Sequence, residues 1–257
     1  MKAVILAGGT QSTISDDYEG IPKPMAEIGE KPILWHIMKM LSTYGITEFI
    51  ICGGYKVNML KDYFKDFYIY QSDITVDLQN NTVICHRNRT ENWYVTVVDT
   101  GLNSSACQRL IQVKEYIRES DFLVVHGDCI SDINISELVE CHQSNNKMLT
   151  LAVAKPTGRS AMLPIDEEGF YLEEVQALLP QNQAWADACF RIFKADIFNY
   201  LDEDSDFGML LFRKLADMKE MISYFHYGFW CPMETKRDKM YLEKLWSTDM
   251  APWKIWN

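Results

Sequence analysis

Hydrophobic positions along the chain form short continuous runs, separated by segments in which apolar residues recur every three to four positions. The runs are almost entirely apolar, which is typical of strands buried on both faces of a sheet. The predicted strands are 3–7, 48–52, 94–98, 122–125 and 149–154, and the predicted helices are 33–44, 57–67 and 135–142. Strands that alternate with helices predict βαβ units. The expected fold class is therefore α/β, with a doubly wound, mainly parallel sheet.

One segment departs from this rhythm. Residues 74–79 and 82–86 alternate between apolar and polar positions on either side of Asn80 and Asn81. Because asparagine tolerates positive φ, this pattern predicts a β-hairpin inserted into the α/β framework.

After Pro156 the pattern is less regular. A strand is expected near 188–193 and helices near 195–201 and 209–217, which gives a C-terminal α+β portion. No repeat, low-complexity tract or flexible linker interrupts the chain. We therefore interpret residues 1–257 as one domain, made of a core over 1–160 and a second part over 161–257.

Composition narrows the class of protein. The 257 residues are 47% hydrophobic and 24% charged, as in an ordinary globular protein, and the formal net charge is −11. Such a charge weighs against binding to nucleic acid or to an anionic membrane surface. An anionic small substrate would need a local cluster of Lys and Arg.

Cysteine usage points to a reducing compartment. The seven cysteines are scattered, odd in number and without a Cys-x-x-Cys pair. This pattern indicates neither a disulfide framework nor a structural zinc site. No apolar run is long enough for a membrane span, and no signal peptide is recognisable. The expectation is a cytoplasmic protein.

The first strand ends in Gly8 and Gly9, which can bring backbone N–H groups close to a phosphate or a base. The dinucleotide-binding fingerprint is absent because Gln11-Ser12-Thr13 follows. A simple tight turn is the alternative. The nucleotide interpretation gains weight from Lys23, which Pro22 and Pro24 hold in a stiff segment where a triphosphate could lie.

His126-Gly127-Asp128 follows the apolar run 122–125. A carboxylate just beyond a parallel strand lies where such sheets bind their ligands. Beside phosphate, its natural role is to bind Mg²⁺. The alternative is a cap for the next helix, although Asp132 and Asn134 are nearer to Ile135.

These motifs carry a resemblance that spans nearly the whole chain. The sequence resembles the glucose-1-phosphate cytidylyltransferase family of sugar-phosphate nucleotidyltransferases. The matching stretches are 1–9, 22–25, 27–29, 31–39, 98–101, 109–110, 127–128, 158–159, 228–230, 232–233, 237–239, 241–243 and 251–254.

The resemblance implies a Rossmann-like nucleotidyltransferase fold, with a nucleotide-binding core over 1–160 and an acceptor-side and oligomerisation part over 161–257. It implies transfer of CMP from CTP to a phosphorylated acceptor with release of pyrophosphate, assisted by Mg²⁺. The implied nucleotide-binding residues are Leu6, Ala7, Gly8, Gly9, Lys23 and Arg109, the catalytic pair is Lys23 and Asp128, and the metal ligands are Asp128 and Glu234. Glu234 stands where the family has Asp. Members of the family form homo-oligomers, so the aromatic tail near Trp253 is a possible subunit contact.

The departures from the family lie where the chemistry is expected. Gln11 and Thr13 replace a glycine and an arginine of the phosphate loop, and 106–108 replaces Thr-Gly-Gly. On the acceptor side, 177–180 replaces Glu-Lys-Pro, 187–189 replaces Asn-Gly-Gly, and 207–211 replaces Trp-Glu-Gln-Glu-Pro. A site that loses such polar groups discriminates poorly for its old substrate.

Three interpretations stay open: a CTP-using enzyme with a changed phosphorylated acceptor, an impaired paralogue that acts as a binding or regulatory partner, and the family reaction on glucose 1-phosphate itself. His36, inside a matching segment, is interpreted as structural. His86, His142 and His226 lack metal-ligand spacing.

Overall fold

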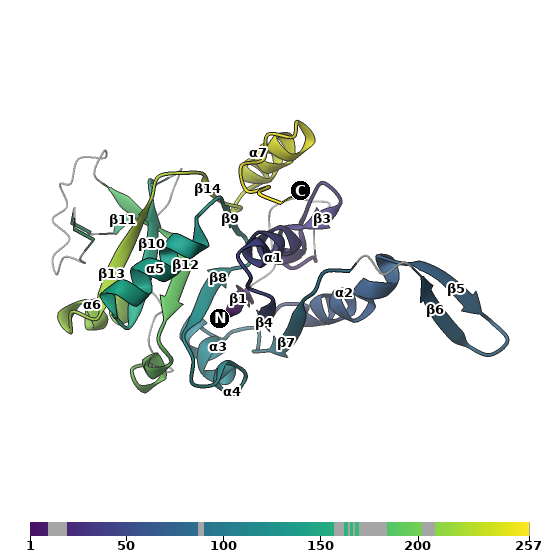
Figure 1. The fold of residues 1–257 in the computed structure, drawn as a ribbon, viewed down its shortest axis with the longest axis horizontal. Helices are drawn as coiled ribbons and strands as arrows, with labels where there is room; N and C mark the ends of the chain where they lie inside the picture. Colours follow the sequence, from purple (N-terminus) through teal and green to yellow (C-terminus); the bar gives the residue numbers. More distant parts are fainter. Residues whose placement is uncertain are drawn as a thin grey trace.

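The computed structural model describes residues 1–9, 20–86, 90–156, 162–163, 165–166, 168–169, 184–201 and 209–256. These residues build an eight-stranded central sheet with helices on both faces (Figure 1). The strands are, in spatial order, β13 (Met221–His226), β10 (Leu149–Ala154), β12 (Trp185–Phe193), β8 (Phe122–His126), β1 (Lys2–Ala7), β4 (Glu48–Gly53) and β7 (Tyr94–Asp99), with β11 (Met162–Leu163) paired to β12.

The direction of the strands confirms the fold class and adds one feature. β1 pairs in parallel with both β4 and β8, β4 with β7, and β10 with β13. β12 is antiparallel to both β8 and β10, which makes the sheet mixed and mainly parallel. Strands from both parts of the chain alternate in this sheet. The division of the chain into a nucleotide-binding core over 1–160 and an acceptor-side part over 161–257 stays a prediction.

Alternate side chains of β1 pack against different helices. Ala3 and Ile5 lie in one hydrophobic cluster, and Val4 lies in the other. The first cluster is covered by α1 (Ile33–Thr43), α5 (Ile135–Asn145) and α7 (Lys236–Ser247), and the second by α3 (Ala106–Gln112), α4 (Lys114–Ile117) and α6 (Met209–Asp217). Such two-sided burial explains the continuous apolar runs in the sequence.

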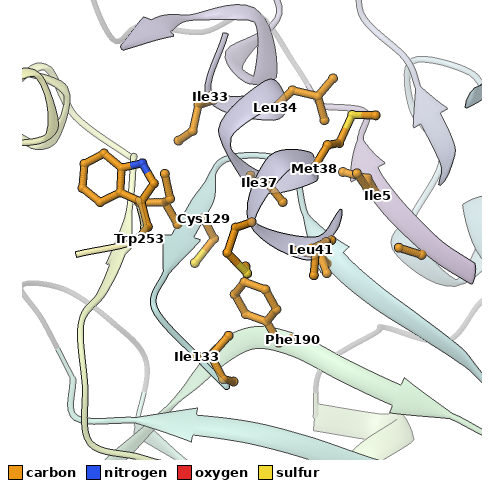
Figure 2. Close-up of a cluster of buried hydrophobic side chains, with 14 of the residues drawn as sticks. Ile5, Ile33, Leu34, Ile37, Met38, Leu41, Cys129, Ile133, Phe190 and Trp253 are labelled. Carbon is orange, nitrogen blue, oxygen red and sulfur yellow. The ribbon is translucent and has the colours of Figure 1, made fainter. Parts of the chain in front are cut away.

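The first cluster joins the C-terminal tail to the core. Figure 2 shows Trp253 beside Ile33 and Ile37 of α1. Trp253 is fully buried and its Nε1 donates to His36 Nδ1 at 3.5 Å, while His36 Nε2 lies 2.9 Å from the carbonyl oxygen of Ile28. Burial lowers the pKa of His36 to about 4. The structural interpretation of His36 is confirmed, and Trp253 packs within its own chain.

The predicted hairpin is present. α2 (Val57–Tyr70) leads into β5 (Asp73–Asp77) and β6 (Thr82–His86), which pair with each other and extend away from the sheet (Figure 1). Asn81 has the positive φ of 51° that the turn requires.

The C-terminal predictions hold in part. α6 has the predicted bounds, and residues 195–199 form a 3₁₀ helix, η4 (Ala195–Asn199), where a longer helix was expected. Tyr200 N bonds to Ile197 O, three residues back, which tightens the turn and ends it. The pattern did not predict α3, α4, β11, β13 or α7. It also did not predict the short elements η2 (Lys23–Met25), β2 (Glu27–Ile28), β3 (Lys31–Pro32), β9 (Cys129–Ser131) and β14 (Trp230–Pro232).

Candidate active site

Three predicted motifs meet at the carboxyl ends of β1 and β8. Gly127 N donates to Leu6 O at 3.0 Å, so the turn after β8 lies directly beside the end of β1. A side chain at Gly127 would lie 3.1 Å from Pro24, which means that the Lys23 segment packs onto the same turn. The sheet thus brings together residues that the sequence separates widely.

The central contact of this site is an ion pair between Lys23 Nζ and Asp128 Oδ2 at 3.0 Å. Both side chains are about a quarter to a third exposed, so solvent and ligand can reach them. Asn134, and not Asp128, caps α5, since its side chain accepts from Ser136 N and Glu137 N. The capping alternative for Asp128 is therefore wrong.

The guanidinium of Arg109 packs against Gly8. Its side chain is buried, and a Cβ built on Gly8 would fall 2.1 Å from its Nη1. The guanidinium donates to Gly53 O at 3.1 Å and to Thr100 Oγ1 at 2.6 Å. Gly8 is required by this packing, whereas a Cβ on Gly9 would meet no atom within 4 Å.

The replacement of Thr-Gly-Gly by 106–108 is accommodated locally. Gln108 forms a capping box with Ser105, its side-chain oxygen accepting from Ser105 N at 2.8 Å while Ser105 Oγ accepts from Gln108 N. Cys107 is buried in the second cluster. The new side chains thus start α3 and pack beneath it.

Glu234 is carried to the same turn by the pairing of β14 with β9. Met233 N donates to Asp128 O at 2.8 Å, and Glu234 follows just before Thr235, the N-cap of α7. The Glu234 side chain is exposed. Within the described residues no three His, Cys, Asp or Glu side chains form a metal cluster. The backbone thus brings two acidic residues, Asp128 and Glu234, to one turn, and Mg²⁺ commonly takes one or two carboxylates together with substrate phosphates.

In β12, the backbone at Cys189 keeps a conformation that favours glycine. Cys189 has a φ of 66°, in the left-handed region, and its N–H donates to Asp187 Oδ1 at 2.7 Å. The sequence argument that 187–189 changes the acceptor side therefore concerns side chains and not the path of the chain. Residues 11, 13, 158–159, 177–180 and 207–208, to which other departures and matches were assigned, lie outside the described residues.

Comparison with known proteins decides the family. The model of the family described as "Nucleotidyl transferase" matches residues 2–162. The chain is 40% identical over the full length of both chains to a glucose-1-phosphate cytidylyltransferase of Salmonella typhi, and 33% identical, again over the full lengths, to a probable one of Bacillus subtilis. The chain belongs to the sugar-phosphate nucleotidyltransferase family. The resemblance drawn from its motifs is thus confirmed.

Solved structures confirm the fold. HddC from Yersinia pseudotuberculosis superposes with a TM-score of 0.69 at 18% identity, over 95% of this chain and 99% of that one. An apo UDP-glucose pyrophosphorylase reaches a TM-score of 0.72 at 16% identity, over 97% and 99%. Both structures share the Rossmann-like arrangement of this chain. Full-length similarity to cytidylyltransferases also favours an enzyme over an impaired paralogue.

The structure also describes the cysteines and the lengths of the helices. No two of the seven cysteines, all of them described, are joined by a disulfide. In the described part of the chain, no helix is both long and apolar enough to cross a membrane.

Sequence reasoning missed one group of side chains around Cys189. It consists of Cys129, His126, Asp187 and Arg191. Cysteine spacing gave no signal, because the antiparallel pairing of β12 with β8 alone brings these positions together.

Proposed function

We propose that the protein transfers CMP from CTP to a phosphorylated acceptor and releases pyrophosphate. The observation that carries this proposal is the Lys23–Asp128 pair, held at 3.0 Å beside the end of β1. Full-length identity of 40% to a protein described as a glucose-1-phosphate cytidylyltransferase supports CTP as the donor.

The chain's own groups suit this chemistry. Leu6, Ala7, Gly8 and Gly9 offer backbone at the edge of the sheet, and Lys23 offers a cation to the triphosphate. Arg109 stays a proposed nucleotide-binding residue, and its guanidinium also links the ends of β4 and β7 through Gly53 and Thr100. Because the reaction is an in-line displacement at phosphorus, positioning and charge neutralisation account for most of the catalysis.

Asp128 and Glu234 are the residues proposed to hold Mg²⁺. The ion would supply neutralisation of the triphosphate charge. Lys23 is the partner of Asp128 in the structure, so it is free to turn towards phosphate once the carboxylate binds a cation.

The acceptor is a phosphorylated small molecule. Asp187 and Cys189 stand where the family has Asn and Gly, which argues against glucose 1-phosphate itself. Pyrophosphate release measured with CTP, UTP or dTTP in Mg²⁺, across a panel of phosphorylated acceptors, tests this directly. CTP-dependent release with at least one acceptor other than glucose 1-phosphate is expected. CTP binding without turnover on any acceptor would instead favour the partner role.

We also propose a homo-oligomer and a reducing, cytoplasmic setting. The β5–β6 hairpin exposes apolar side chains, among them Ile74, Val76 and Ile84, and an isolated two-stranded hairpin is only marginally stable in water. A second copy of the chain is its proposed cover. A light-scattering mass equal to that of the monomer would refute the oligomer.

A further inference from the structure

Two cysteines that are distant in the sequence meet beside the candidate active site. β12 runs antiparallel to β8 with Phe190 opposite Val125, which places Cys189 next to His126. Cys129 begins β9 just after Asp128, and its Sγ lies 3.6 Å from the carbonyl oxygen of Ala188. Ala188 directly precedes Cys189, whose own Sγ lies 3.8 Å from the carbonyl oxygen of Asp187, so the two cysteines lie side by side.

Their surroundings differ. Cys129 is fully buried, and Trp230 Nε1 donates to its sulfur at 2.9 Å. Cys189 is partly exposed and has the positive φ of 66°. Cys189 is therefore the more accessible residue of the two.

A chain of side chains orients His126 towards Cys189. Arg191 is paired with Asp187 through Nη2 and through Nε at 3.1 Å, and its Nη1 lies 3.0 Å from His126 Nε2. A guanidinium only donates, so Nε2 must accept. The proton of a neutral His126 is then on Nδ1, which is the nitrogen left to donate to the Cys189 sulfur.

These donors favour the thiolate form of Cys189. The hydrogen bond from Cys129 is the largest influence and lowers the pKa of Cys189 to about 6, burial opposes it, and His126 lowers the pKa further. The Asp187 carboxylate acts in the opposite direction. Low-pKa thiols that solvent can reach are the ones that oxidants attack.

We propose that Cys189 is a peroxide-reactive thiol and that Cys129 is its resolving partner. The Cys189 thiolate attacks one oxygen of hydrogen peroxide, the O–O bond breaks, hydroxide leaves, and a sulfenic acid forms. Cys129 then attacks that sulfur, the S–O bond breaks, and its thiol proton leaves with the hydroxyl as water, which gives a Cys129–Cys189 disulfide. Peroxide is thereby reduced and the two thiols are oxidised.

The test needs no enzymatic turnover, so it stands apart from the proposed function. The reduced full-length protein is treated with stoichiometric hydrogen peroxide, free thiols are alkylated, and non-reduced peptides are mapped by mass spectrometry. We expect a linked peptide pair that contains Cys129 and Cys189, with the exposed Cys85 still alkylated. Recovery of both Cys129 and Cys189 as alkylated thiols would overturn the proposal, as would equally fast oxidation of Cys85.

Variants separate the two roles. In Cys129→Ser, the sulfenic acid at Cys189 has no resolving thiol, and dimedone should trap it roughly tenfold faster than any adduct at Cys85. An absence of that adduct in a folded Cys129→Ser protein would count against the proposal. Cys189→Gly suits the local backbone and provides a folded control, in which peroxide should form no disulfide at Cys129.

Discussion

The two sides of the β8 carboxyl end hold their polar side chains in different ways. On the side of β1 and β4, the buried guanidinium of Arg109 bonds to the carbonyl oxygens of Gly53 and Leu102. The fold itself supplies these acceptors, so they persist when side chains elsewhere change.

On the side of β12, side chains bind one another. Asp187 pairs with Arg191, and Arg191 contacts His126. Each member depends on the identity of the next, so one substitution rearranges the whole group. Side chains beside β1 and β4 are therefore held by backbone acceptors, whereas those of β12 can change their chemistry while the path of the chain stays the same.

The largest effect is expected at Asp128, in the turn that follows β8. Asp128→Asn keeps the shape of the side chain but removes its charge, and loss of one preorganised electrostatic group typically costs on the order of 10²–10³ in rate. Pyrophosphate release measures the effect. Asp249→Asn is the matched control, because Asp249 forms an exposed ion pair with Lys254. Equal rates for Asp128→Asn and the unaltered protein would refute the metal assignment.

The second prediction concerns His36, which is buried in α1. Burial holds the pKa of His36 at about 4, below the ordinary 6.5. As pH falls through this window the unfolded chain takes up a proton before the folded one, so stability falls, by roughly 3 kcal/mol at most. Urea unfolding at several pH values measures the slope.

His36→Gln is the control for that slope. Glutamine does not titrate, so the free energy of unfolding of the variant should depend less on pH between 4 and 6.5. The difference between the two proteins isolates His36 from His142, whose pKa is also lowered. Identical slopes would contradict the prediction.

The third prediction tests whether Arg109 requires a glycine at position 8. Gly8→Ala would force its new Cβ into Arg109, which cannot move without breaking its hydrogen bonds to Gly53 and Thr100. A loss of about 1–3 kcal/mol in the free energy of unfolding is expected. Gly9→Ala should be nearly neutral, because that Cβ meets no atom. Equal losses in the two variants would show that Arg109 does not impose the glycine.

The smallest effect is expected at Cys189 in β12. At a φ of 66°, Cys189→Gly should be more stable than Cys189→Ala by about 1 kcal/mol, because only glycine adopts this conformation without strain. Chemical denaturation of the two variants gives the difference. If alanine were as stable as glycine, the backbone at 189 would not be held in the left-handed form.

Much of the fold was predictable because its strands are buried on both faces. Continuous apolar runs identified β1, β4, β8 and β10, and α6 has its predicted bounds. Short strands such as β9 and β14 gave no pattern, since two or three residues cannot show a period. β12 was expected near 188–193, but its antiparallel direction depends on long-range pairing that no local signal records.

The candidate site divides in the same way. Asp128 follows a strand end and Lys23 lies between two prolines, and both local signals can be read from the sequence. The two side chains form an ion pair at 3.0 Å. The contact between Gly8 and Arg109 was not, because it joins β1 to a helix far along the chain. The proximity of Cys129 and Cys189 could not be predicted either, because these residues also lie far apart in the sequence.

Calorimetric titration with CTP in Mg²⁺ tests the central claim most directly, using the unaltered protein, Lys23→Met and the exposed control Lys254→Met. We expect the unaltered protein to bind CTP, Lys23→Met to bind it about tenfold or more weakly, and Lys254→Met to bind it with little change. No CTP binding by the unaltered protein, or equal affinity in Lys23→Met, would contradict a nucleotide site built around Lys23 and Asp128.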